Sequence, residues 1–299
     1  MTSPKSRSLS SRPRDGHALS QLARLAAVVA LTGMVGLVAS TAGADGLPAV
    51  DQAADATEPA DRGSATQAIP VPGPPSYGGC LVGTVSTVSS SVDPQRRWTV
   101  GTKSSSWRSA LYPVAGVKGP VVVVGDSLTV GAMDTTMRNL VDAGYGPVCI
   151  DGAVSRRVNV SGDVTSGLQV IARIKGSDPV WQMPVVRWTI ALGTNDVRAA
   201  TSYNAVYSSL ITMTRNAIGP VTVTMYWLNV RTDRPTWKSF ENEFNVRIPA
   251  AGTVVIDWAA FVDGPPVKSE LFAGDDVHLN GSGYTQRGGL TANTIIATT

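Results

Sequence analysis

Four polar side chains in three short motifs have the types and spacing that acyl-transfer chemistry needs. Ser127 lies in a Gly-Asp-Ser-Leu sequence, Asn195 lies in Gly-Thr-Asn-Asp, and His278 follows Asp275 by three residues. A serine hydroxyl can attack a carbonyl carbon when a histidine takes its proton, and a carboxylate can fix the tautomer of that histidine. An asparagine side chain can donate a hydrogen bond to the oxyanion that forms.

Each motif alone also has a plainer explanation. Asp, Ser and Asn at the start of a helix are common caps, and a single histidine beside acidic residues is usually a surface side chain. His17 and His278 are the two histidines of the chain. A zinc site made of Cys and His is not expected, since it needs about four such ligands.

The elements that would position these side chains begin near residue 119. Apolar runs at 121–124, 148–150, 185–192, 221–228 and 254–258 alternate with helical patterns at 128–143, 167–175, 203–217, 237–247 and 282–296. The runs are rich in β-branched residues with little polar alternation, which predicts strands buried on both faces. Strand–helix alternation predicts one α/β/α sandwich around a parallel sheet, whose sites lie at the carboxyl ends of its strands. All three motifs follow predicted strands.

The N-terminus has the pattern of an export signal. A basic region is followed by 15 apolar residues at 25–39 and by the small-residue sequence Ala-Gly-Ala at 42–44. This order predicts a cleaved signal peptide over 1–44 and a secreted or cell-wall-associated protein. The alternative is an uncleaved membrane anchor, although a spanning helix needs about 20 apolar residues.

Two further segments precede the sandwich. Residues 45–76 are rich in Ala, Asp, Pro and Gly, which predicts a disordered linker. Residues 77–117 are rich in Ser, Thr and Gly and predict an irregular or β-rich extension, which would either cover the site or brace the sheet. Cys80 and Cys149 are the two cysteines, and in an oxidising compartment they predict a disulfide between the extension and the sheet.

The charge distribution argues against a nucleic-acid partner. Residues 1–44 hold five of the 25 basic side chains and one of the 22 acidic ones, so 20 basic and 21 acidic groups remain. A basic surface is therefore not indicated.

Together the three motifs, in this order and spacing, resemble the SGNH hydrolases, also called GDSL esterases, of the secreted bacterial type. The resemblance covers about residues 119–297. It implies a flavodoxin-like sandwich with a five-stranded parallel sheet and no metal or organic cofactor. It also implies Ser127 as nucleophile, His278 as base, Asp275 as the partner that orients it, and Asn195 as an oxyanion donor beside the Ser127 N–H.

One position departs from the family pattern. A glycine after the second strand normally gives another oxyanion N–H, and by distance from the strand Ser155 stands there, with Gly162 as the second candidate. A backbone donor survives the change if the local backbone suits serine. Arg156 and Arg157 follow directly, and they would either meet an acidic or glycan substrate or be solvated loop side chains.

Three functions share these residues. The first is a secreted carboxylic-ester hydrolase for short acyl groups, including O-acetyl groups on a glycan, with a small-molecule or glycan ester as its partner. The second is a cell-wall glycan O-acyltransferase, because the sequences around Trp227 and Trp258 resemble domains linked to cell-wall O-acetylation. The alternative is that both rings are core aromatics. The third is a non-catalytic glycan-binding domain. No multi-spanning domain is present to supply acyl groups, which favours the hydrolase, and acceptor competition separates it from the transferase.

Overall fold

The computed structural model describes residues 79–89, 95–160, 164–199 and 205–299. The predicted signal peptide at 1–44 and linker at 45–76 lie outside the described residues. None of the helices in this described part has the length and apolarity that a membrane crossing requires.

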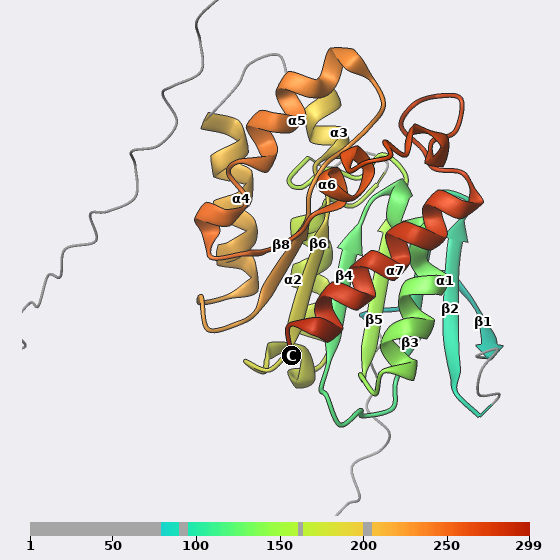
Figure 1. Ribbon diagram of the computed structural model, residues 1–299. Helices are drawn as coiled ribbons and strands as arrows, with labels where there is room; N and C mark the ends of the chain where they lie inside the picture. The colour runs from blue at the N-terminus through green and yellow to red at the C-terminus, as the bar shows by residue number, and fades with distance from the viewer. Residues whose placement is uncertain (1–78, 90–94, 161–163, 200–204) are drawn as a thin grey trace, which may run out of the picture. The chain divides into compact units, whose positions relative to one another are not determined.

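A single mixed sheet forms the centre of the fold (Figure 1). Its order is β1-β2-β3-β5-β4-β6-β7-β8. The strands are β1 (Thr84–Ser89), β2 (Arg97–Ser104), β3 (Trp107–Tyr112), β4 (Val121–Gly125), β5 (Val148–Ala153), β6 (Arg187–Ala191), β7 (Met225–Leu228) and β8 (Val254–Ile256). The strands from β5 to β8 are parallel, and β1, β2 and β3 join the β5 edge in antiparallel pairs. The predicted five parallel strands are therefore present, but the sheet has eight strands because part of the segment 77–117 extends it.

Helices cover both faces of the parallel part (Figure 1). They are α1 (Ser127–Asp142), α2 (Gly167–Ser177), α3 (Thr194–Ala199), α4 (Ala205–Ile218), α5 (Lys238–Asn245), α6 (Trp258–Asp263) and α7 (Gly281–Ala297). Short 3₁₀ helices lie at Pro179–Gln182, Pro235–Trp237, Pro249–Ala251 and Ser269–Leu271. Helices α1, α6 and α7 share one apolar core with the sheet, and α2, α4 and α5 share the other. This is the predicted α/β/α sandwich.

The two cores follow from the period of the strands. Successive strand side chains point to opposite faces. In β4 the side chains of Val121 and Val123 enter the core under α1 and α7, whereas Val122 and Val124 enter the core under α2 and α4. All four are buried, which explains why the strand lacks polar alternation.

Some predicted boundaries were wrong where apolar residues lie outside the sheet. The run 221–228 forms a strand only from Met225, and Val221 is 73% exposed. The run 254–258 ends as a strand at Ile256, because Asp257 caps helix α6 through the Ala260 N–H. The short run 148–150 forms the six-residue β5.

The N-terminal strands brace the β5 edge. Strand β3 pairs with β5 along its length, and the predicted Cys80–Cys149 disulfide is present. The Val154 N–H donates to the Ser106 carbonyl at 2.7 Å, just beyond the paired strands. These contacts hold the start of the loop that follows β5.

Order in the parallel sheet also locates the site. Reading from β5, the chain order of the five parallel strands is 2-1-3-4-5. The chain therefore passes from β4 to β5 on one side of β4 and continues through β6, β7 and β8 on the other. A crevice opens at the carboxyl ends of strands that diverge in this way, here β4 and β6.

Candidate active site

The nucleophile candidate stands at the first turn of a helix. Ser127 is the first residue of α1, directly after β4. Asp126 is fully buried and caps the helix by accepting from the Leu128 N–H at 3.0 Å. The first N–H groups of a helix have no intrahelical acceptor and carry partial positive charge. The turn therefore presents a hydroxyl beside a backbone donor.

Burial raises the pKa of Asp126, while the positive charge of Arg287 and the Leu128 N–H oppose the rise. Arg287 is itself buried on α7, and burial lowers its pKa to about 10 although Asp126 opposes this. The residue before Ser127 is thus a buried carboxyl group, Asp126, whose electrostatic partner is the Arg287 guanidinium.

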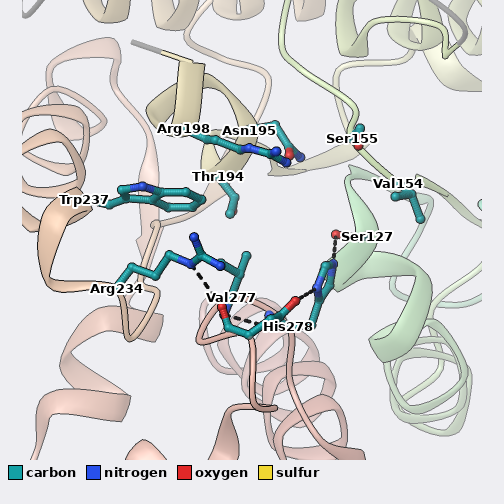
Figure 2. A pocket seen from close by; sticks show the side chains of 11 residues that line it. Ser127, Val154, Ser155, Thr194, Asn195, Arg198, Arg234, Trp237, Val277 and His278 are labelled. Carbon is teal, nitrogen blue, oxygen red and sulfur yellow. Dashed lines mark hydrogen bonds and ion pairs between the residues drawn. The ribbon is translucent and has the colours of Figure 1, made fainter. Parts of the chain in front are cut away.

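His278 connects Ser127 to a carboxylate (Figure 2). Its Nε2 lies 3.0 Å from the Ser127 Oγ, and its Nδ1 lies 2.5 Å from Asp275 Oδ2. With the proton on Nδ1, that nitrogen donates to the carboxylate and Nε2 accepts from the serine hydroxyl. This is the order of contacts that the sequence predicted for the three side chains.

The loop itself fixes Asp275. The other oxygen of its carboxylate, Oδ1, accepts from the N–H groups of Val277 and His278 at 3.1 and 2.9 Å. Partial burial would raise the pKa of Asp275, but the hydrogen bonds from the His278 ring, the His278 N–H and the Val277 N–H lower it to about 2. The carboxylate is therefore charged at neutral pH and faces the imidazole.

Asn195 enters the same crevice from the end of β6. The preceding Gly193 has φ +130°, and a Cβ there would lie 2.7 Å from atoms of Phe244 and Val230. Only glycine fits this turn, which delivers Asn195 to the start of α3. One Asn195 Nδ2 hydrogen points to the Arg156 carbonyl at 3.2 Å, so the amide keeps a second hydrogen for another acceptor.

Ser155 lines the crevice in a backbone conformation typical of glycine. Its φ is +62°, in the left-handed region. The sequence predicts that Ser155 occupies the family's glycine position, and a backbone of this conformation favours glycine. The alternative, Gly162, lies outside the described residues.

The interpretation of Arg156 as a substrate contact or a solvated side chain was wrong. Arg156 is 1% exposed and its Nη2 pairs with Asp151 Oδ1 at 2.6 Å. Its Nη1 donates to the carbonyls of Gly125 and Asp151, and its Nε donates to Thr165. Arg173 also pairs with Asp151. We call Asp151, Arg156 and Arg173 the Asp151 cluster; it lies behind the loop and ties it to β4 and β5.

Arg157, by contrast, is half-buried beside a second carboxylate. Burial raises the pKa of Asp196 to about 7, against the hydrogen bond from the Val158 N–H and the charge of Arg157. Both Asp196 carboxylate oxygens accept from that N–H, at 3.2 and 3.3 Å. Asp196 thus fastens the loop after β5 to the start of α3.

A cavity of about 140 Å³ opens over these groups (Figure 2). The described residues that line it are Ser127, Val154, Ser155, Thr194, Asn195, Arg198, Arg234, Trp237, Asp275, Val277 and His278. The proposed nucleophile, base, orienting carboxylate and two oxyanion positions are all among them, whereas Arg156 and Arg157 are not.

Arg198, Arg234 and Trp237 were missed by the sequence analysis. Arg198 lies on α3, which the sequence did not predict, and the other two lie in the segment after β7. Their position in the sequence could have indicated them, because each lies in the segment that follows the carboxyl end of a predicted strand. Within the described residues, no group of three or more His, Cys, Asp or Glu side chains is placed to hold a metal ion.

Residues 123–286, more than half of the chain, match the model of the GDSL-like Lipase/Acylhydrolase family, and the chain belongs to this family. No curated protein sequence matches the chain.

Three solved structures are similar to part of this chain. The lipase/acylhydrolase from Enterococcus faecalis is 20% identical, with a TM-score of 0.46 over 60% of this chain and 96% of that one. The peptidoglycan O-acetyltransferase catalytic domain of Streptococcus pneumoniae is 16% identical, with a TM-score of 0.43 over 61% and 93%. An acetyl xylan esterase from Geobacillus stearothermophilus is 15% identical, with a TM-score of 0.44 over 61% and 95%.

Proposed function

We propose that this protein is a serine esterase that hydrolyses carboxylic esters of short acyl groups through an acyl-enzyme. The observation that carries the proposal is the chain of contacts from Ser127 Oγ through the His278 ring to Asp275, at 3.0 and 2.5 Å. A nucleophile, a base and a group that orients the base are the parts that acyl transfer requires.

In the first half-reaction the Ser127 Oγ attacks the ester carbonyl carbon while His278 Nε2 takes the hydroxyl proton. The carbonyl π-bond electrons move to the oxygen, which becomes the oxyanion. When this intermediate collapses, the bond to the alkoxy oxygen breaks and His278 gives its proton to the departing alcohol. Asp275 keeps Nδ1 protonated and stabilises the positive imidazolium.

Three donors would hold the oxyanion: the Ser127 N–H, the Ser155 N–H and the Asn195 Nδ2. They come from the ends of β4, β5 and β6, on the crevice side of the sheet. Removing one such donor costs about 2.7–4 kcal/mol of transition-state stabilisation in a measured enzyme. In the second half-reaction, water attacks the acyl-serine with His278 as base, which releases the carboxylic acid and restores Ser127.

The size of the cavity supports a short acyl group. Pockets that enclose drug-sized ligands occupy about 300–1,000 Å³, whereas this one has about 140 Å³. We therefore propose acetyl and similarly small acyl groups as substrates. Export of the enzyme is also part of the proposal, supported by the signal pattern at 1–44 and by the Cys80–Cys149 disulfide, which persists in oxidising compartments.

Hydrolysis of p-nitrophenyl esters from acetyl to palmitoyl by the purified protein tests the proposal. We expect turnover to be highest for acetyl and to fall in Ser127→Ala by a factor on the order of 10⁶ in kcat. A glycan acceptor should neither speed turnover nor become acylated. Absence of Ser127-dependent turnover on every ester would overturn the proposal, and acylated glycan would replace the hydrolase with an acyltransferase.

A further inference from the structure

Two arginines face the cavity that the ester would occupy. Arg198 and Arg234 both line it. Among the described residues that line the cavity, Asp275 is the acidic one. Since Asp275 accepts hydrogen bonds from His278 and from two N–H groups of its own loop, its charge is already engaged by the base. The cavity therefore keeps an excess of positive charge beside the reacting serine.

Arg234 is held in a defined orientation. Its Nε donates to the Asp275 carbonyl at 3.0 Å, and its guanidinium lies 5.1 Å from the centre of the Trp237 ring. Figure 2 shows the guanidinium extending from the Trp237 side into the space between Thr194 and Val277. The stacking and the Nε hydrogen bond fix the guanidinium but do not engage its two Nη groups. These have no hydrogen-bond partner among the described residues.

A planar guanidinium with two free nitrogens matches the geometry of a carboxylate. Arg198 adds a second positive charge from α3, on the Asn195 side of the cavity (Figure 2). Two like charges that face one small cavity repel each other, and an anion between them relieves this repulsion. Arg156, by contrast, already has a carboxylate partner in Asp151.

We infer that the substrate is an O-acetylated sugar that carries a carboxylate, bound by Arg234 and Arg198. The inference rests on the proposed function, because a short acyl group has no room for a charge and the anion must belong to the alcohol part. The small cavity places the carboxylate close to the ester, on the same sugar ring. The indole edge of Trp237 beside Arg234 adds an apolar surface for that ring.

Two matched substrates test the charge. An O-acetylated methyl glucuronoside and its uncharged carboxamide differ only at the group that the arginines would bind. Released acetate gives kcat/KM for each. Since hydrogen bonds to charged groups contribute more than neutral ones, we expect the acid to exceed the carboxamide by about 10-fold or more. Arg234→Gln should reduce this ratio toward one, and Arg198→Gln should reduce it partly.

Arg97→Gln is the matched control, because Arg97 is exposed at the start of β2, away from the cavity, and the ratio should stay at the wild-type value. A wild-type ratio near one would overturn the inference. So would an Arg234 variant that lowers both substrates equally, since that pattern indicates a structural role through the Asp275 loop. If the carboxamide is hydrolysed in a Ser127-dependent manner, the proposed function stands even when the inference fails.

Inhibition of p-nitrophenyl acetate turnover separates a sugar acid from any anion. Free glucuronate should inhibit competitively at concentrations where inorganic phosphate does not. Equal inhibition by phosphate would show that the site selects charge alone and would overturn the sugar assignment.

Discussion

Charged side chains behind and in front of the loop after β5 have opposite environments. Behind it, the Asp151 cluster is closed: Asp151 and Arg156 are buried and paired, and Arg173 completes the pair of guanidinium groups on one carboxylate. In front of it, Arg198 and Arg234 face an open cavity. The first set fixes the loop and the second is free to meet a ligand. Adjacent positions in sequence, such as Ser155 and Arg156, fall on different sides of this division.

The largest expected effect is the loss of kcat on replacing Asp275, the carboxylate on the cavity side of the loop. In Asp275→Asn the histidine loses the acceptor that sets its tautomer, and kcat should fall by a factor of up to about 10⁴, as in a measured serine enzyme. Asp275 is exposed, so the free energy of unfolding should change by only about 0.5 kcal/mol. Steady-state kinetics and urea denaturation measure both. A large stability loss with unchanged kcat would reverse the roles of the two regions.

The next largest effect is expected behind the loop. Arg156→Met leaves Asp151 with one guanidinium and removes the donors to Gly125 and Thr165. Breaking a buried pair in this way costs about 3–5 kcal/mol of unfolding free energy. Arg234→Met is the control, and it should change stability by about 0.5 kcal/mol or less. Urea denaturation of the two variants decides, and equal stabilities would show that Arg156 is not a structural contact.

A smaller effect concerns a buried carboxylate that lacks an ion pair within the described residues. Burial raises the pKa of Asp196 to about 7, so the folded protein binds a proton that the unfolded chain releases near pH 4. Because the folded state holds the extra proton, stability falls as pH rises from about 4 to 7, by up to about 1.4 kcal/mol per pH unit for one group. Asp196→Asn should flatten this slope in urea titrations across that range. An unchanged slope would show that the pH dependence of stability does not come from Asp196.

The smallest effect is expected at Ser155. A left-handed backbone costs a non-glycine residue about 1–2 kcal/mol, and glycine relieves this strain but loses entropy on folding. Ser155→Gly should therefore change stability by less than about 1 kcal/mol and preserve kcat, since the backbone N–H remains. A large loss of kcat on this substitution would assign the role to the serine hydroxyl instead.

The sequence predicted the parts of the fold that depend on local pattern. The β-branched runs, the helices between them and the positions of Ser127, Asn195 and His278 after strands all follow from periodicity and motif. The segment 77–117 was harder, because its strands are defined by pairing rather than by their own apolar pattern. Strand β3 pairs with β5, β2 pairs with β3, and β1 pairs with β2 although Thr84–Ser89 is mostly exposed. Trp227 and Trp258 proved to be core aromatics, both fully buried.

The sequence predicted the site residues that belong to a motif. It missed those that only tertiary packing brings to the site. Nothing in the sequence around Arg156 distinguishes it from Arg157, because its burial depends on Asp151 and Arg173 from other elements. Arg198 and Arg234 belong to the cavity because α3 and the segment after β7 both contribute to its lining, and Arg234 donates to the loop of His278. Their position after predicted strands indicates the edge of the sheet, but which side chains enter the cavity depends on contacts between distant segments.

Covalent labelling of Ser127 tests the central claim most directly. Brief incubation with p-nitrophenyl acetate, acid quenching and mass spectrometry of the digested protein should find one acetyl group, on Ser127, in the wild type. Asp275→Asn should accumulate the same adduct more slowly, and Ser127→Ala should carry none. An acetyl group on another residue, or unchanged ester turnover in Ser127→Ala, would contradict the account.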